Sequence, residues 1–251
     1  MYEVQNAELI DNIKEITDYN VKDLRYELPR HENRVKKRML NRIKMVIVHC
    51  TAADDSALPD VYNIARYHTS PGCHICPEHG CPTIAYHAVV ELVNNEPVIE
   101  IAANIEDIVY AVGKWNYITY NIAVNYSGIG KVRDDIFEAL VDITSAVAKY
   151  FDIHPAFGIW GHRNLEKTGF NIINNKIVFR KSCPGEIDVL DLQKRVIVKN
   201  LGDKYIWNEH IAQNEVCNGK FSTTIPFITY DTYKIMDKRG MLTFKWDKWK
   251  V

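Results

Sequence analysis

The chain has 251 residues, of which 47% are hydrophobic and 25% are charged, and its formal net charge is −1 at pH 7. These values are ordinary for a globular protein with one sizeable domain or two small ones, and they give no electrostatic case for a nucleic-acid partner. No run of residues reaches the length and apolarity of a membrane span, so we expect no stable membrane insertion.

Residues 1–42 are predicted to form a helical N-terminal extension. Apolar residues recur at helical spacing from Leu9 to Ile16, and the same spacing returns from Val21 to Leu28, just before Pro29. The charged segment that follows is predicted to be a solvated connector rather than a binding patch.

Residues 43–199 are predicted to form an α/β domain, because apolar strand patterns alternate with amphipathic helix patterns. The expected strands cover residues 43–49, 83–93, 96–102, 121–130 and 156–162, and the expected helices cover residues 59–68, 134–151 and 187–199. From about residue 200 the composition becomes β-prone and aromatic, which predicts a small β-rich C-terminal appendage over residues 200–251.

Three residues that can bind a metal each close a predicted element or turn. The apolar run "KMVIVHC" ends in His49, the short strand "AFGIWGH" ends in His162, and Cys183 precedes the turn formers Pro184-Gly185. Two imidazoles and a thiolate, with a fourth position kept for water, make a typical catalytic zinc site. A lone histidine is more often a core residue, but three such residues together favour a site.

Two further residues suit the same chemistry. Lys181 lies two positions before Cys183, so in an extended segment both side chains point the same way, and an ammonium group there can stabilise an oxyanion. In "AYHAVV", Tyr86 and His87 point to opposite sides of the predicted strand, so at most one of them faces the metal.

The motif order "VHCTA … RYH … AYHAVV … NIAVNYSG … GHR … KSCPG" resembles the zinc-dependent N-acetylmuramoyl-L-alanine amidases of the type 2 family, which includes phage lysozyme-amidases (endolysins) and peptidoglycan recognition proteins. The resemblance covers about residues 43–198. It implies a mixed central β-sheet flanked by helices, with one Zn²⁺ bound by His49, His162 and Cys183 in a groove. Tyr86 and Lys181 match the family's catalytic tyrosine and lysine.

The activity implied by this resemblance is hydrolysis of the amide between N-acetylmuramic acid and L-alanine of bacterial peptidoglycan. In that scheme Tyr86 positions or helps deprotonate the water, and Lys181 steadies the oxyanion. Two alternatives on the same fold are a non-catalytic peptidoglycan-recognition module and a virion structural module. Non-catalytic relatives typically lose the cysteine ligand, whereas this chain keeps Cys183.

The chain departs from the family at the groove. Twenty residues separate His162 from Cys183, more than in close phage relatives, and "NIINNKIVF" within them predicts an inserted hairpin with an Asn-Asn turn. Where many relatives have His-Ala, this chain has Tyr110-Ala111, so we expect Trp115 or Asn116 to supply substrate contacts.

The loop "CHICPEHGC" is a candidate second, structural zinc site formed by the following residues: Cys73, Cys76, His79 and Cys81. Free thiols and a disulfide are the alternatives. The tryptophans of the C-terminal appendage are able to stack on sugars, which favours cell-wall binding, or to pack on the main domain.

No signal peptide is visible at the N-terminus, so we expect synthesis in the cytoplasm. The protein would then reach the cell wall or periplasm after holin-dependent release, or from outside as part of a virion.

Overall fold

We describe a computed structural model of the chain, which covers residues 2–53, 58–165, 170–173, 176–179 and 183–201. Its helices and strands follow in chain order: α1 (Tyr2–Ile16), β1 (Asn20–Asp23), β2 (Met45–Cys50), α2 (Val61–Thr69), β3 (Ala88–Val93), β4 (Glu96–Ile101), β5 (Thr119–Val124), α3 (Asp134–Tyr150), α4 (Pro155–Gly158), β6 (Ile159–Gly161), β7 (Phe170–Ile173), β8 (Lys176–Phe179) and α5 (Val189–Leu201). Short 3-10 turns also occur within the described residues, at Glu32–Arg34, Leu40–Arg42, Gly113–Trp115 and His162–Asn164.

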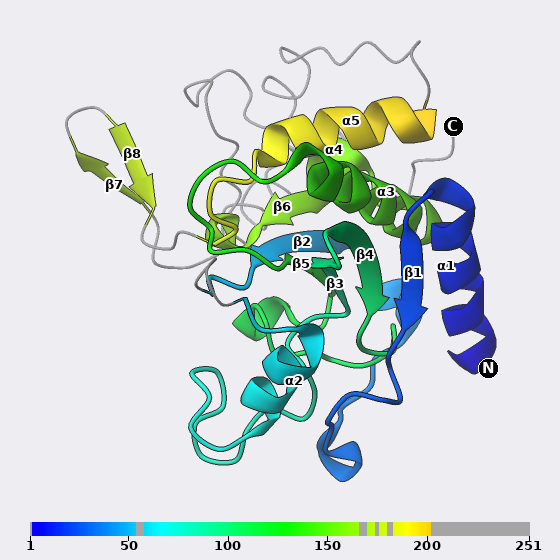
Figure 1. Cartoon of the computed structure of the whole chain (residues 1–251), viewed down its shortest axis with the longest axis vertical. Coiled ribbons are helices and arrows are strands. Elements are labelled where there is room, and N and C mark those ends of the chain that lie inside the picture. The colour runs from blue at the N-terminus through cyan, green and yellow to red at the C-terminus, as the bar shows by residue number, and fades with distance from the viewer. Residues whose placement is uncertain (1, 54–57, 166–169, 174–175, 180–182, 202–251) are drawn as a thin grey trace, which may run out of the picture.

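Six strands form one mixed sheet in the order β1-β4-β3-β5-β2-β6 (Figure 1). Strands β3 and β4 form an antiparallel hairpin, and the other neighbouring pairs are parallel. Strands β2, β5 and β6 therefore end at the same edge of the sheet, which is where sites form in open α/β sheets.

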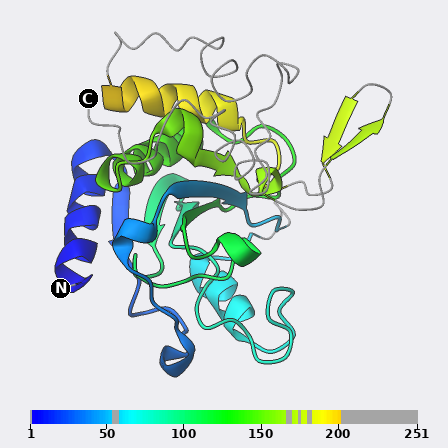
Figure 2. The same cartoon turned by 180° about the vertical axis from the view of Figure 1, so that it is seen from behind.

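Helices cover both faces of the sheet (Figures 1 and 2). Helices α1, α3 and α5 pack their apolar residues against one face, while α2 packs against the other. Strand β2 is buried along its whole length, because Val46 and Val48 face the larger helical layer and Met45 and Ile47 face the opposite side. His49 continues the second set and so lies on the α2 side.

The expected α/β architecture is confirmed, and the corrections concern local boundaries. The helical spacing over residues 21–28 is misleading, because Asn20–Asp23 forms edge strand β1, paired with β4. Strand β3 begins at Ala88, so Tyr86 and His87 precede it. Residues expected to open a strand at 156 instead form the helical turn α4 before β6.

The predicted inserted hairpin is confirmed, since β7 and β8 pair antiparallel on either side of residues 174–175. The predicted appendage at 200–251 lies almost wholly outside the described residues, and the division of the chain at residues 42 and 199 stays a prediction. No helix in the described part of the chain is long and apolar enough to cross a membrane.

Candidate metal centre and its pocket

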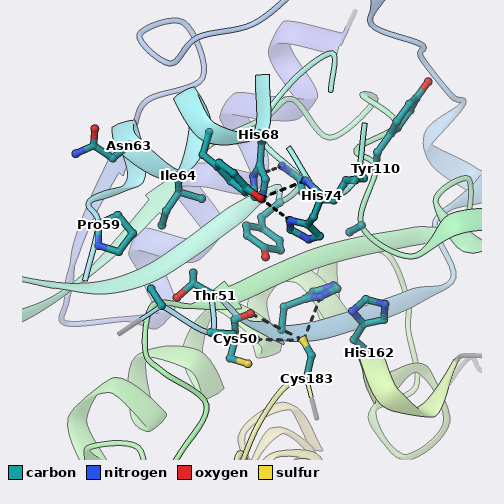
Figure 3. A pocket seen from close by; sticks show the side chains of 18 of the residues that line it. Cys50, Thr51, Pro59, Asn63, Ile64, His68, His74, Tyr110, His162 and Cys183 are labelled. Atoms are coloured by element: carbon teal, nitrogen blue, oxygen red, sulfur yellow. Dashed lines mark hydrogen bonds between the residues drawn. The ribbon is translucent and has the colours of Figure 1, made fainter. Parts of the chain in front are cut away.

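A pocket of about 970 Å³ opens at the carboxyl ends of β2 and β6, on the face covered by α2 (Figure 3). Its floor carries His49, His162 and Cys183, and its opposite wall carries side chains from α2 and from the loop that follows α2. Every residue that lines it within the described part of the chain is uncharged or a histidine or cysteine.

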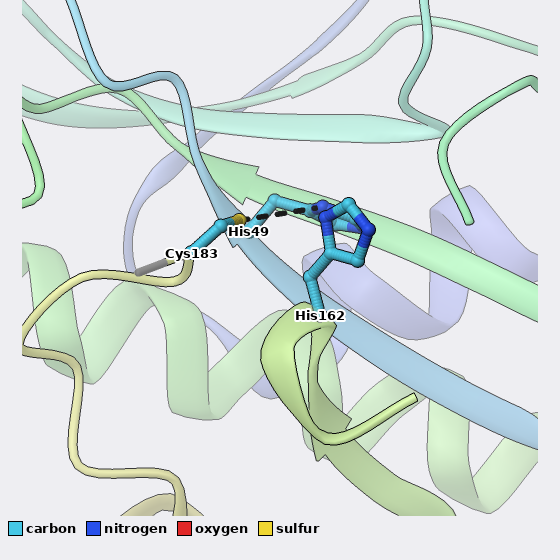
Figure 4. Close-up of side chains that lie close together, drawn as sticks. All are labelled: His49, His162 and Cys183. Carbon is cyan, nitrogen blue, oxygen red and sulfur yellow. Dashed lines mark hydrogen bonds between the residues drawn. The ribbon is translucent and has the colours of Figure 1, made fainter. Parts of the chain in front are cut away.

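The three predicted ligands come together on this floor (Figure 4). One side-chain donor atom of each lies within 4.8 Å of the other two, and Cys183 Sγ is 3.7 Å from His49 Nδ1. Zinc bonds of 2.3 Å to sulfur and about 2.0–2.1 Å to nitrogen place such a pair about 3.6 Å apart in a tetrahedral site. The donor types and their spacing therefore fit Zn²⁺.

Asn121 on β5 fixes the orientation of the His49 ring. Its Oδ1 lies 3.0 Å from His49 Nε2, and its Nδ2 donates to Thr119 Oγ1 at 3.1 Å, which fixes which way the amide points. Since an amide oxygen only accepts, Nε2 carries the hydrogen and Nδ1 keeps its lone pair on the Cys183 side. A hydrogen-bonded partner of this kind is usual behind a metal-binding histidine.

The turn that carries Cys183 is fastened to the end of β6. The backbone N–H of Arg163 donates to the Cys183 carbonyl at 2.8 Å, and the Arg163 guanidinium donates to the Gly185 carbonyl at 2.6 Å. Tyr126 donates its hydroxyl to the Pro184 carbonyl, and the Cys50 N–H lies 3.4 Å from Cys183 Sγ. Gly185 adopts a φ of +69°, and a Cβ there would lie 2.4 Å from Gly128.

Tyr86 lies beside the three candidate ligands, with its ring centroid 5.3 Å from that of His49. Burial, with smaller contributions from Cys183 and Cys50, raises the pKa of the Tyr86 phenol. The hydroxyl is therefore protonated at neutral pH and is able to donate a hydrogen bond into the pocket.

His68 on α2 packs edge-on against Tyr86, with a centroid separation of 5.5 Å. Its Nδ1 accepts a hydrogen bond from the Ala85 N–H at 3.2 Å, and burial lowers its pKa to about 4. His68 is therefore a neutral imidazole in the pocket wall.

His87 does not line the pocket. Tyr86 and His87 are neighbours that point to opposite sides of the chain, so His87 lies behind the pocket when Tyr86 faces it. Its Nδ1 accepts from the Asn121 N–H at 3.0 Å, and the Arg38 guanidinium lies 2.9 Å from its Nε2. Burial, and then the charge of Arg38, lowers the pKa of His87 well below its usual value. This ring is a neutral structural group.

The remaining predicted site residues fall in different places. Asn116 lines the pocket, where its Oδ1 accepts the N–H groups of Ala111 and Val112. Trp115 is buried in a neighbouring apolar cluster and donates its indole N–H to the Leu165 carbonyl, away from the pocket lining. Lys181 lies outside the described residues.

The cysteine-rich loop brings three of its four predicted donors together. The Sγ atoms of Cys73, Cys76 and Cys81 lie within 4.8 Å of one another. His79 does not belong to this group, and its side chain is 77% exposed.

Sequence patterns did not reveal several residues that the structure places in the pocket wall or behind a candidate metal ligand. Asn121 is a polar residue inside the apolar run "NIAVNY", and that contrast was the available signal for it. Several residues that line the pocket lie on α2 or in loops and carry no such signal; they are Thr51, Asn63, Tyr67 and His74.

Residues 39–186 match the protein-family model described as N-acetylmuramoyl-L-alanine amidase. This match covers more than half of the chain and includes all three candidate ligands and Tyr86. No curated protein sequence matches the chain.

Solved structures with a similar fold include two endolysins. They are the endolysin amidase LysCS from Clostridium intestinale (13% identity, 70% of this chain and 95% of that chain, TM-score 0.49) and the endolysin of a Thermus scotoductus bacteriophage (15%, 70% and 99%, 0.47). The Drosophila peptidoglycan recognition protein SA matches at 12% identity, with 70% of this chain and 91% of that chain covered and a TM-score of 0.50. At these identities the likeness concerns the fold.

Proposed function

The chain belongs to the N-acetylmuramoyl-L-alanine amidase family, and on this basis we propose that it hydrolyses the amide between N-acetylmuramic acid and L-alanine in bacterial peptidoglycan. The observation that carries the proposal is the grouping of His49, His162 and Cys183 on the floor of a pocket, with the protonated Tyr86 beside them. The family assigns the substrate class, and the donor set supports hydrolysis rather than recognition alone.

We assign Zn²⁺ to His49, His162 and Cys183. A zinc ion held there would act as a Lewis acid and lower the pKa of a bound water toward neutrality. The protein holds the donors ready: Asn121 keeps His49 Nδ1 unprotonated, and the N–H of Cys50 supports a negative charge on the Cys183 sulfur.

Tyr86 acts in this proposal as a hydrogen-bond donor. As a donor it would orient the attacking water or stabilise charge on the carbonyl oxygen of the substrate. Its position next to the His49 ring suits either contact. Lys181 is proposed to stabilise the same oxyanion through its positive charge, on the strength of its spacing from Cys183.

The pocket suits a neutral, polar glycopeptide. Thr51, Asn63, Tyr67 and Asn116 offer hydroxyl and amide groups along the pocket lining, and such groups pair with sugar hydroxyls and peptide amides. Tyr110, at the position where many relatives have histidine, adds an aromatic surface to the rim.

Mass spectrometry of purified peptidoglycan tests the activity. We expect the protein to release stem peptides with a free L-alanine amine and to leave the glycan chains intact. A chelator should stop this release, and added zinc should restore it. A folded, zinc-loaded protein that releases no peptide from several wall chemotypes would contradict the proposal and favour a recognition or virion structural role.

We further propose that the enzyme acts as a phage-type lysin. The motifs "HCTA", "YH" and "K-x-CP", which resemble those of phage amidases, support this role. The protein would be made in the cytoplasm and would reach the cell wall through a holin or as a virion component. Two lysis assays separate these routes. Release through a holin predicts lysis of cells that co-express the protein with a holin, and delivery from outside predicts lysis by added protein.

A further inference from the structure

We propose that the loop between α2 and Tyr86 binds a second zinc ion through the thiolates of Cys73, Cys76 and Cys81, with water in the fourth position. This second site is distinct from the His49, His162 and Cys183 centre. It does not depend on the amidase activity, because it concerns metal content and loop structure.

The spacing of the three sulfurs carries the proposal. Cys73 Sγ and Cys81 Sγ are 3.9 Å apart, and all three sulfurs lie within 4.8 Å of one another. Two thiolates on a tetrahedral zinc ion are about 3.8 Å apart, given a Zn–S bond of 2.3 Å. Three sulfur atoms from one nine-residue stretch thus already stand at ligand spacing, whereas a disulfide would use two of them and leave the third without a role.

Burial raises the pKa of the Cys76 and Cys81 thiols, so a bound ion has to supply most of the stabilisation of the thiolates, and two contacts in the loop assist it. The N–H of Cys76 donates to Cys73 Sγ at 3.1 Å, and hydrogen bonds from backbone amides stabilise negative charge on sulfur. The Arg34 guanidinium donates to the carbonyls of His79 and Gly80, at 2.7 Å each, so it brings a positive charge to the same loop. Both contacts help to hold the charge that three thiolates would bring to one ion.

The turns of the loop are built to present the cysteines. Gly72 and Gly80 have φ values of +87° and +69°, and a Cβ on Gly80 would lie 2.0 Å from the Thr69 carbonyl oxygen. The N–H of Gly80 donates to the Cys76 carbonyl at 2.9 Å, and the N–H of Gly72 donates to the Pro77 carbonyl at 2.7 Å. The loop has no regular secondary structure from residue 70 to residue 87, and most of residues 70–79 are exposed or half-buried, so a metal would supply the cross-link that a core supplies elsewhere.

The site would act on the catalytic pocket through the residues between its ligands. His74 and Ile75 lie between Cys73 and Cys76, and both line the pocket. Figure 3 shows the His74 side chain on the wall opposite the candidate catalytic ligands. The His74 ring stacks on Tyr67 of α2, with centroids 5.8 Å apart. An ion at the cysteines would therefore fix one wall of the groove opposite the candidate catalytic ligands.

The experiment measures zinc per chain, by elemental analysis, in full-length protein purified anaerobically with reductant and zinc. We expect two zinc ions in the wild type, one in Cys183→Ala and one in Cys76→Ser. Cobalt substitution shows which site remains in each variant. The cobalt form of Cys183→Ala should keep the strong sulfur-to-metal absorption of three thiolates. The cobalt form of Cys76→Ser should show the weaker absorption of one thiolate.

His79→Ala is the matched control in the same loop, and we expect it to keep both zinc ions. Limited proteolysis should cut Cys76→Ser, but not His79→Ala, faster than wild type within residues 70–82. A folded Cys183→Ala protein without zinc would overturn the proposal, as would a Cys73–Cys81 disulfide in the anaerobic protein. Loss of one zinc ion in His79→Ala would overturn the assignment of three thiolates and water.

Discussion

Replacing Asn121 with alanine should weaken zinc binding at the His49 centre without touching a metal ligand. In the wild type, Asn121 Oδ1 accepts the hydrogen from His49 Nε2 at 3.0 Å, in a site where His49 is 2% exposed. The variant leaves that buried N–H without its acceptor, which costs about 1–3 kcal/mol. It also allows the His49 ring to carry its hydrogen on Nδ1, and Nδ1 needs its lone pair free to bind the metal.

The expected loss in zinc affinity is about 10- to 100-fold, the usual effect of removing a hydrogen-bonded partner behind a metal ligand. This corresponds to about 1.4–2.8 kcal/mol, which agrees with the cost of the unpaired N–H. Thr119 adds little to this cost, because its hydroxyl still donates to the Trp115 carbonyl at 3.1 Å. Asn121→Asp keeps an acceptor for His49 and should recover most of the affinity.

Competition against a chromophoric chelator measures the affinity, in the Cys76→Ser background so that the cysteine loop does not contribute. Asn6→Ala is the matched control: Asn6 is also a buried asparagine, but its side chain bonds Glu106 and the Ile105 N–H. It should lower thermal stability and leave zinc affinity unchanged. An Asn121→Ala protein with wild-type zinc affinity would refute the reasoning about the His49 ring.

Cys183→Ala should lose zinc at the catalytic centre and all peptide release, and near-wild-type turnover in this variant would disprove the ligand assignment. Lys181→Ala should keep the zinc and lose much of the rate of peptide release. Tyr86→Phe keeps the ring packing, so zinc content should be unchanged while kcat on peptidoglycan falls about 10²- to 10³-fold; an unchanged kcat would remove Tyr86 from the chemistry. Burial, then the nearby Glu100 carboxylate, raises the pKa of Glu91 from its ordinary value of 4.5 to about 8 in the folded protein. Between these two pH values the folded chain therefore binds a proton that the unfolded chain does not bind. The free energy of unfolding consequently falls as pH rises through this window. Glu91→Gln should therefore raise stability at pH 8.5 by roughly 2–4 kcal/mol in urea unfolding, more than at pH 5, and an equal effect at both pH values would contradict the shifted pKa.

The sequence predicted the sheet well where strands are buried on both faces. The run ending at His49 and the first part of the run predicted as a strand over residues 121–130 contain few polar residues, and such runs have few alternatives to a central strand. The end of the second strand was predicted wrongly, because β5 stops at Val124. The same rule fails at the edge of the sheet. Asn20–Asp23 is exposed or half-buried, so its apolar spacing suits a helix as well as a strand, and its pairing with β4 decides the outcome.

The ligand set was predictable because each histidine ends a recognisable apolar strand. Two parallel neighbours, β2 and β6, bring His49 and His162 to one edge. The supporting contacts were not predictable, because they join segments far apart in sequence. Asn121 meets His49 across 72 positions, and Tyr126 meets the Pro184 carbonyl across 58. Register and turn geometry decide these contacts, and neither is read from a local pattern.

The long segment between His162 and Cys183 does not displace the cysteine, because both ends of the segment are fastened at one place. The Arg163 N–H and guanidinium hold the carbonyls of Cys183 and Gly185, so the chain leaves β6 and returns to the same turn. The entropy of closing a loop grows only slowly with its length, by about 0.6 kcal/mol for each doubling. Residues added between these anchors, including the hairpin of β7 and β8, therefore lengthen the segment while the position of the Cys183 sulfur is kept.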